Sequence, residues 1–115
     1  MLKKSYRLKD RALFQKAFRF GKPFFFGNIG CKVFFDPTAK KKVGFALAKK
    51  ILPLAVHRNA IKRLLSQEVV SSWDDIPPHA FVVFFLRKRP EPEGRDSLRS
   101  DFSGLISKIK NYKLQ

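Results

Sequence analysis

One continuous apolar run limits the folds that this chain can adopt. Ala80 to Leu86 are seven consecutive apolar residues, and they lie between Pro78 and Pro90. A membrane-spanning helix needs roughly 20 such residues, so this run is far too short to cross a bilayer. Its length and its proline boundaries favour a central strand of a sheet over Phe81–Leu86. The remaining segments must then supply further strands and the helices that cover them.

The first helix is predicted over Asp10–Phe20. Asp10 suits the N-cap because its carboxylate can accept hydrogen bonds from the free N–H groups of the first turn, and Gly21 follows the last periodic residue. The apolar residues recur with the 3.6-residue period of a helix that covers a core. They are Leu13, Phe14, Ala17 and Phe18. From this pattern alone, Phe14 and Phe18 fit core packing as well as a nucleic-acid surface.

Two further helices are predicted from the same period. The second runs from Leu54 to about Trp73, and Pro53 suits its first turn. The third is capped by Asp96 and carries its apolar face to Tyr112. The residues expected to be buried are Ile61, Leu64, Leu65 and Val69 in the second helix and Leu98, Phe102, Leu105, Ile106, Ile109 and Tyr112 in the third.

Two more strands are predicted between the first and second helices. Ile29–Phe35 alternates in the manner of a strand, Lys42–Ala48 alternates with a face of small residues, and the two are expected to form a hairpin. The run Phe24–Phe26 fits three roles, namely covering a sheet edge, contacting RNA, or burial in the core. The expected order is α-β-β-α-β-α. Residues 1–115 are therefore expected to form a single α+β domain, with the sheet packed against helices.

The charge of the chain is large and uneven. It has 25 Lys and Arg against 9 Asp and Glu, a formal net charge of +16. Residues 1–67 account for +15 of this, and no acid occurs from Pro37 to Gln67. Solubility needs a net charge of only about 2 to 8 in a small domain, and like charges repel in a compact state. The excess predicts a polyanionic partner, with nucleic acid first and an anionic membrane surface second.

Composition excludes several other classes. Hydrophobic residues make up 44% of the chain, too many for a disordered polycation. The single cysteine, Cys31, rules out a disulfide framework, and with two histidines it cannot complete a four-ligand zinc site. It is expected to be an inert core residue. The N-terminus enters charged residues at Lys3 without an apolar segment, so no signal peptide is predicted. We expect a soluble, cytoplasmic protein with no membrane partner and no obligate protein partner.

The second helix carries a compact polar set in its N-terminal half. Arg58 and Lys62 are four residues apart, as are Asn59 and Arg63, so all four lie on adjoining rows of one face. Cations at this end oppose the helix dipole by about 0.3–1 kcal/mol each, and a sequence selected for stability alone would place acids there. The pattern favours docking onto phosphate, and the plain alternative is a solvated helix face.

Taken together, these segments resemble the protein subunit of bacterial ribonuclease P. The resemblance covers nearly all of the chain in the same order. It is carried by three stretches: Arg7-Leu8 with Phe14-Gln15-Lys16-Ala17-Phe18 and Gly21; Lys49-Lys50 with Arg58-Asn59, Ile61 and Lys62-Arg63; and Phe81–Leu86 with Arg87-Lys88.

The resemblance implies a fold and a division of labour. The family fold joins its parallel strands by a left-handed crossover and leaves an open cleft beside the first helix. The RNA subunit is the ribozyme, and it removes the 5′ leader of precursor tRNA with Mg²⁺ that it mainly binds itself. The resemblance implies that the protein belongs to this endoribonuclease without a catalytic residue or metal site of its own, and that it binds the RNA subunit and the leader.

The resemblance also implies roles for particular residues, and the chain departs from the family pattern near them. Ala60 and Ser66 stand where arginines are usual, Ala48 stands in place of a serine, and Leu52-Pro53-Leu54 replaces a glycine-containing loop. Loss of two cations predicts that fewer phosphates are bound, and Lys40 to Lys42 are candidates to compensate. The implied RNA-subunit contacts are Arg58, Asn59, Lys62, Arg63, Lys49 and Lys50, and the implied leader cleft holds Phe14, Phe18, Arg11 and Phe34.

Two other functions fit part of the pattern. A small basic ribosomal or RNA-assembly protein, without a role in cleavage, would share the charge. An RNA-cleaving enzyme acting alone would need an acid–base pair such as His57 and His79, or clustered carboxylates. The two histidines fall on different predicted elements, and Asp74-Asp75 lies in a loop outside the basic zone.

Overall fold

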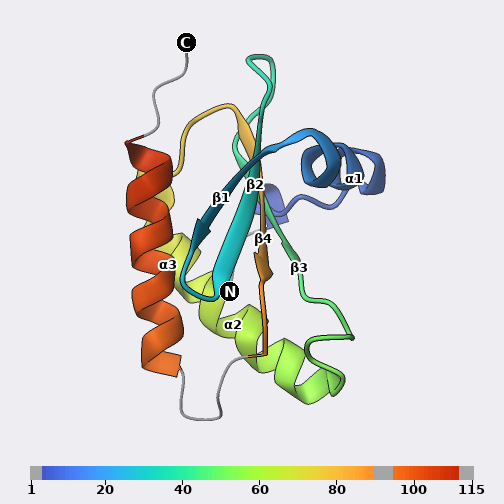
Figure 1. Ribbon diagram of the computed structural model, residues 1–115. Coiled ribbons are helices and arrows are strands. Elements are labelled where there is room, and N and C mark those ends of the chain that lie inside the picture. The colour runs from blue at the N-terminus through green and yellow to red at the C-terminus, as the bar shows by residue number, and fades with distance from the viewer. Residues whose placement is uncertain (1–3, 90–94, 112–115) are drawn as a thin grey trace.

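A computed structural model of the protein describes residues 4–89 and 95–111 (Figure 1). The α+β class is confirmed, with one mixed four-stranded sheet and helices on both of its faces. Tyr112 lies outside the described residues. Among those residues, no helix combines the length and the apolar character needed to cross a membrane. In chain order the elements are η1 (Lys4–Tyr6), α1 (Arg11–Phe20), β1 (Lys22–Phe26), β2 (Ile29–Phe35), β3 (Lys42–Ala46), α2 (Ala55–Ser71), η2 (Trp73–Asp75), β4 (Ala80–Leu86) and α3 (Arg95–Lys110).

Strand β4 lies inside the sheet, as predicted, because the strand order is β1-β2-β4-β3. It pairs antiparallel with β2 and parallel with β3. The predicted hairpin of β2 with β3 is wrong, since β2 pairs instead with β4 and with the additional strand β1. The order of elements is therefore α-β-β-β-α-β-α. Gly27 lies in the short β1–β2 turn with a φ of 58°, a conformation that glycine adopts without steric cost.

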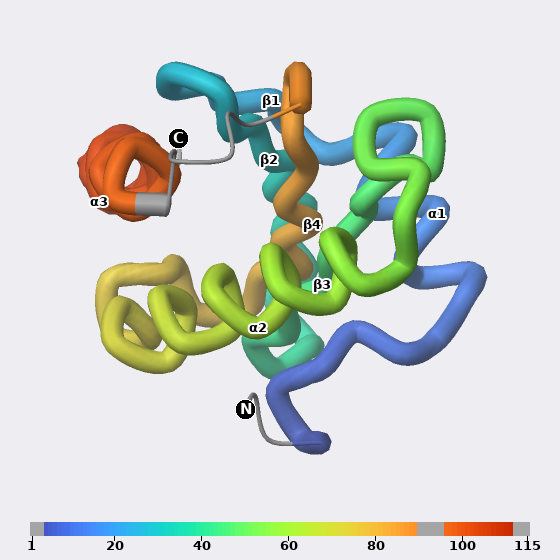
Figure 2. Tube along the Cα trace, turned by 90° about the horizontal axis from the view of Figure 1, so that it is seen from below, coloured from blue at the N-terminus to red at the C-terminus, as the bar shows by residue number. Residues whose placement is uncertain are grey.

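The connection between the parallel strands β3 and β4 runs through α2. Both strands run downward in Figure 1, and the view from below in Figure 2 shows α2 passing on the same side of the sheet as α3. The path from β3 through α2 to β4 is therefore a left-handed turn. This is the handedness that the family resemblance implies. It runs against the strong right-handed preference of such crossovers, so general topology rules could not supply it.

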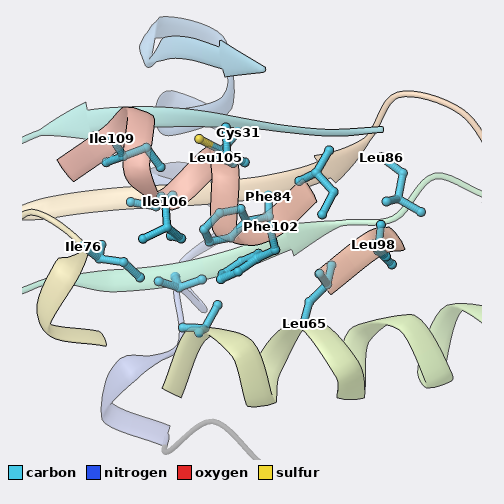
Figure 3. Close-up of a cluster of buried hydrophobic side chains, with 14 of the residues drawn as sticks. Cys31, Leu65, Ile76, Phe84, Leu86, Leu98, Phe102, Leu105, Ile106 and Ile109 are labelled. Carbon is cyan, nitrogen blue, oxygen red and sulfur yellow. The ribbon is translucent and has the colours of Figure 1, made fainter. Parts of the chain in front are cut away.

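The main core lies between the sheet and the helices α2 and α3 (Figure 3). Phe84 of β4 packs against Phe102 of α3 with ring centroids 5.1 Å apart. The residues predicted to be buried in α2, and those in the described part of α3, are buried. Cys31 also lies in this core, and burial raises the pKa of its thiol to about 12. It is thus the inert core residue that the sequence predicts.

Helix α1 covers the opposite face of the sheet. Its N-cap Asp10 accepts hydrogen bonds from the backbone N–H groups of Ala12 (2.9 Å) and Leu13 (3.2 Å), as predicted. Gly21 ends the helix with an extended backbone, at a φ of −67°. A Cβ at Gly21 would lie 2.4 Å from the carbonyl oxygen of Ala17, so glycine is required there for space.

Candidate nucleic-acid interface

Helix α1 divides its face of the sheet into two sides. Ala17 is fully buried and packs in one cluster with Val83 of β4. The residues on either side of Ala17 point in opposite directions, because successive helical residues are rotated by about 100°. Lys16 reaches Phe34, and Phe18 reaches Phe85. We name the side of α1 toward Lys16 the closed side (Lys16, Phe34, Ala39 and Phe81) and the side toward Phe18 the open side (Phe18, Phe25 and Phe85).

The closed side is a small core of its own. Phe34 stacks on Phe81 with nearly parallel rings and centroids 6.5 Å apart, and Phe81 is only 4% exposed. The Lys16 ammonium lies 5.2 Å from the Phe34 ring centroid. Ala39, from the turn before β3, packs on the same cluster. The structure therefore places Phe34, implied as a leader residue, across α1 from Phe18.

On the open side the aromatic rings remain accessible. Phe18 and Phe25 each expose 41% of their surface, and both meet the half-buried Phe85 edge to face, with centroids 5.8 and 6.0 Å apart. The guanidinium of Arg87 lies 4.9 Å from the Phe25 ring centroid. The sequence assigns Phe18 to the leader cleft and leaves Phe25 with three possible roles, but it assigns no binding role to Phe85 or Arg87. Only strand pairing brings these residues together. The available signal was Gly30, since a glycine within a strand often marks a close approach.

A cleft of about 420 Å³ lies where the N-terminal segment, α1, β3 and α2 meet. The N-terminal segment is held there by the Leu8 N–H, which donates to the carbonyl oxygen of Val43 at 2.9 Å. Phe14 packs over Gly44, where a Cβ would lie 2.7 Å from the ring. The cleft thus brings together residues that the sequence assigns to two different contacts. Its lining includes Phe14, Asn59, Lys62 and Arg63, together with Arg7 and Lys9.

Arg58 has a different environment from the other three polar residues of its set. Its Nη1 donates to the carbonyl oxygens of Leu52 (2.7 Å) and Pro53 (2.9 Å), and it is not part of the cleft lining. Hydrogen bonds from a charged donor are stronger than neutral ones, so this guanidinium fastens the loop that leads into α2. Lys49 and Lys50 are exposed in the turn at the other end of that loop.

The positions that depart from the family pattern have specific partners. Ser66 is buried at the cleft, and its Oγ donates to the carbonyl oxygen of Lys62 at 2.7 Å. Lys41, a candidate to compensate for the missing cations, instead donates from Nζ to the carbonyl oxygen of Trp73 at 2.6 Å. Burial lowers the pKa of Lys41. The additional cations at the cleft come from the N-terminal segment, through Arg7 and Lys9.

The two histidines lie at opposite ends of the sheet. His57 follows the end of β3, whereas His79 precedes the start of β4, which runs parallel to β3. His79 is tied through Nδ1 to the carbonyl oxygen of Ala39 before β3, whereas the first turn of α2, which contains His57, lies at the other end of the sheet in Figure 1, so the structure does not bring the two together as an acid–base pair. Within residues 4–89 and 95–111, no three His, Cys, Asp or Glu side chains gather into a group that could hold a metal ion.

The three phenylalanines of β1 have separate environments, as expected where alternate strand residues face opposite ways. Phe24 packs against the main core. Phe25 belongs to the open side. Phe26 is 39% exposed and packs over Gly104 of α3, where the Lys108 ammonium lies 5.5 Å from its ring centroid. Of the three residues in this run, only Phe24 packs against the main core, which is one of the three roles that the sequence allows.

Solved structures define the class of protein to which this fold belongs. The chain is similar to the RNase P protein of Staphylococcus aureus, with a TM-score of 0.73 at 19% sequence identity. The match covers 92% of this chain and 98% of that one. The fold is therefore that of the small α+β RNase P proteins. This chain carries both the basic helix α2 and the exposed rings beside α1.

Sequence comparison identifies the family. The sequence model of the family Ribonuclease P matches residues 2–110. The ribonuclease P protein component of Listeria welshimeri is 36% identical over 93 residues, which is 76% of this chain and 73% of that protein. The component of a Psychrobacter species is 32% identical over 68 residues, so the match spans about half (52%) of that relative. The chain belongs to the bacterial ribonuclease P protein family, the protein subunits of a tRNA 5′-processing endoribonuclease. This finding decides against a ribosomal or RNA-assembly protein.

Proposed function

We propose that this chain binds the catalytic RNA subunit of ribonuclease P and the 5′ leader of precursor tRNA, and so aids endonucleolytic removal of the leader. The RNA subunit carries out the bond cleavage. The observation that carries the proposal is the single cleft in which Asn59, Lys62 and Arg63 lie with Phe14. A basic groove with aromatic rings is what holds single-stranded nucleic acid without strict sequence preference.

The RNA subunit is assigned to the exposed face of α2. Lys62 and Arg63 are exposed, and their charges neutralise phosphates and release counterions. Asn59 offers a donor and an acceptor, which suit a phosphate oxygen or a 2′-hydroxyl. Arg58 holds the loop before α2 and adds its charge beside the same surface. Lys49 and Lys50 extend this surface beyond the end of β3.

The leader is assigned to the edge of α1 that carries Phe14 and Phe18. Their spacing of four residues places both rings on one side of the helix. Arg11 is exposed one turn before Phe14, where it can neutralise a leader phosphate. Phe34 supports this region from the closed side, because it packs on Phe81 beneath α1.

Mg²⁺ is assigned to the RNA subunit. Mg²⁺ prefers octahedral sites built from carboxylate, phosphate and water oxygens. Among residues 4–89 and 95–111, no three His, Cys, Asp or Glu side chains gather into a group that could hold a metal ion, and the proposal therefore gives this chain no metal site of its own. The cations of α2 aid the RNA subunit by offsetting phosphate repulsion, which lowers the Mg²⁺ concentration needed for folding and cleavage.

Reconstitution tests the proposal. The chain is combined with its cognate RNA subunit at low Mg²⁺, and precursor-tRNA cleavage and the affinity of the protein for the RNA are measured. We expect the wild-type chain to raise the cleavage rate. We expect the double variant Lys62→Ala, Arg63→Ala to bind more weakly, and the slope of log affinity against log salt to fall by about 0.7–0.9 for each phosphate that the protein no longer neutralises.

Lys110→Gln is the matched control for the removal of charge. It takes a cation from the last turn of α3, which lies beside η2 beyond the C-terminal end of α2, away from the N-terminal half of α2 that carries Lys62 and Arg63. Lys110 pairs there with Asp75 at 3.2 Å, and an exposed pair of this kind contributes about 1 kcal/mol at most. The control should leave affinity and salt slope unchanged. Absence of stimulation by the wild-type chain, or an equal loss of affinity per charge in the control, would contradict the proposal.

A further inference from the structure

Three side chains from distant parts of the sequence meet at the end of α2 that lies away from the cleft. The Trp73 cluster consists of Tyr6 from η1, Lys41 from the turn before β3, and Trp73 from η2. The Tyr6 and Trp73 rings stack nearly parallel, with centroids 3.9 Å apart. The Lys41 ammonium lies 4.9 Å from the Trp73 ring centroid and donates to the carbonyl oxygen of Trp73 at 2.6 Å. Both rings pack against the main core, so the cluster fastens the start of the chain to it.

Trp73 itself is not placed to contact RNA at the cleft. It follows the last turn of α2, whereas Arg63 lies in the middle of that helix. Ten residues of helix rise about 15 Å. Neither Trp73 nor Lys41 belongs to the lining of the cleft. Any effect of Trp73 on the cleft must therefore pass through another segment.

The N-terminal segment (residues 4–9) connects the Trp73 cluster to the cleft. Tyr6 stacks on Trp73, and two residues later the N–H of the buried Leu8 donates to the carbonyl oxygen of Val43 at 2.9 Å. Arg7 lies between these two anchors, forms a parallel bridge with Val43, and lines the cleft. The direction of Arg7 therefore depends on the stack before it as well as on the hydrogen bond after it.

The charges at the cleft oppose this arrangement in the free protein. Four cations line the cleft, Arg7 and Lys9 from the N-terminal segment and Lys62 and Arg63 from α2, and none of the described lining residues is acidic. Like charges that converge on one place repel, and the repulsion favours displacement of the segment over displacement of the helix, which the core holds. An aromatic stack does not depend on these charges, so it can oppose their repulsion until RNA phosphates are bound.

We propose that the Trp73 cluster holds the N-terminal segment in place for RNA binding, and that Trp73 is a positioning residue that acts through Arg7. The inference rests on the function proposed above. With the stack in place, the Arg7 side chain is directed into the cleft before a phosphate of the RNA subunit arrives. A protein whose binding arrangement is populated only in part loses apparent affinity by that fraction. Trp73 thus raises the affinity for RNA without touching it.

Tyr6→Ala tests the positioning role, and Phe26→Ala is its matched control. Each variant removes one partly exposed ring, but Phe26 packs over Gly104 of α3 and not on the N-terminal segment. The affinity of the full chain for the RNA subunit is measured for each. An aromatic pair changes an equilibrium by about 2- to 10-fold, so Tyr6→Ala should weaken binding by this factor. Tyr6→Phe keeps the stacking ring and should restore affinity, and Phe26→Ala should match the wild type.

A double variant shows whether the effect passes through Arg7. Arg7→Gln removes the charge, so it should weaken binding and lower the slope of log affinity against log salt by about 0.7–0.9. Adding Tyr6→Ala to Arg7→Gln should cause no further loss, because the direction of an uncharged side chain no longer matters. Lys9 does not depend on the stack, since it lies between Leu8 and the N-cap Asp10. General damage to the structure would instead add its full effect to that of Arg7→Gln.

Two results would overturn the positioning role. One is wild-type affinity in Tyr6→Ala although the fluorescence of Trp73, the single tryptophan, shows that the stack is lost. The other is full additivity of Tyr6→Ala and Arg7→Gln. If Tyr6→Ala fails to fold, Trp73→Phe keeps a smaller ring in the core and should lose affinity only while Arg7 is present. Failure of the proposed function reads differently, because the wild type would then bind the RNA no more tightly than the double variant Lys62→Ala, Arg63→Ala.

Discussion

The two sides of α1 use the same type of residue for opposite purposes. On the closed side Phe81 is 4% exposed and Phe34 stacks on it. On the open side Phe18 and Phe25 are each 41% exposed around Phe85. The difference lies in their neighbours. The turn before β3 covers the closed side through Ala39, whereas the open side borders the small residues Gly30 and Ala46, which leave the rings uncovered.

This difference shows that an aromatic side chain of the sheet is buried or exposed according to which segment of the chain packs over it. All of these phenylalanines belong to α1 or to the strands beneath it, and each strand alternates in the usual way. The position of α1 across the sheet, together with the turn before β3, separates the rings that are buried from those that stay exposed. Substitutions on the closed side should therefore change stability, and substitutions on the open side should change binding.

Phe81→Ala is expected to have the largest effect, and the effect is on stability. Removal of a buried ring costs about 3–5 kcal/mol, because transfer free energy is lost and a cavity remains. Phe25→Ala removes an exposed ring and should cost about 1 kcal/mol or less. Urea unfolding followed by the fluorescence of Trp73, the single tryptophan, measures both. Similar decreases in stability in the two variants would remove the distinction between the sides.

Gly30→Ala is expected to have an intermediate effect on stability and to sharpen the distinction. The new methyl group must displace the rings of Phe85 and Phe25, at a cost of about 1–3 kcal/mol, and leader affinity should fall with it. Gly104→Ala is the control, because its methyl group would meet the ring of Phe26 at 2.4 Å on the other face. The control should leave leader affinity intact, measured on the reconstituted holoenzyme. A similar fall in both variants would mean that leader affinity responds to general distortion.

Asp36→Asn is expected to have the smallest effect, a change in stability whose size depends on pH. Hydrogen bonds from the Thr38 hydroxyl and N–H lower the pKa of Asp36 below its ordinary value, aided by the charges of Lys16 and His79. The folded state thus binds the proton less readily than the unfolded state. Its contribution to stability is present above the ordinary aspartate pKa of about 3.9 and is lost as the pH falls through the folded-state pKa.

The measurement for Asp36 is urea unfolding of wild type and Asp36→Asn across pH 2.5 to 7, a range chosen to bracket about 3.9. The difference in unfolding free energy between the two proteins should be constant above about pH 5 and should shrink below about pH 4. A difference that stays constant down to the lowest pH would show that the turn before β3 does not depend on this carboxylate.

The sequence predicted the helices and the central strand because their signals are local. Asp10 caps α1 as its position indicates, and the buried residues of α2 follow the helical period. It did not predict strand β1, because Phe24–Phe26 lacks the polar alternation of a half-buried strand and each ring has a different environment. The false hairpin of β2 with β3 has a related cause. Neighbouring strands usually pair, and here α2 carries the chain to a parallel partner instead.

The candidate site was predicted in part. Asn59, Lys62 and Arg63 form one set on α2 as the spacing indicates, and the cleft joins them to Phe14. The helical spacing could not show that Arg58 bonds to Leu52 and Pro53, because that depends on the path of the preceding loop.

The sequence by itself determined the elements that depend on neighbouring residues: three amphipathic helices, a buried strand over residues 81–86, a basic row on α2 and the match to a family. Only the tertiary structure decided which phenylalanines face solvent, which cations line the cleft and how β3 reaches β4. The physical reason is that burial and strand register join residues far apart in the chain. Phe18, Phe25 and Phe85 meet only because β1, β2 and β4 pair beneath α1.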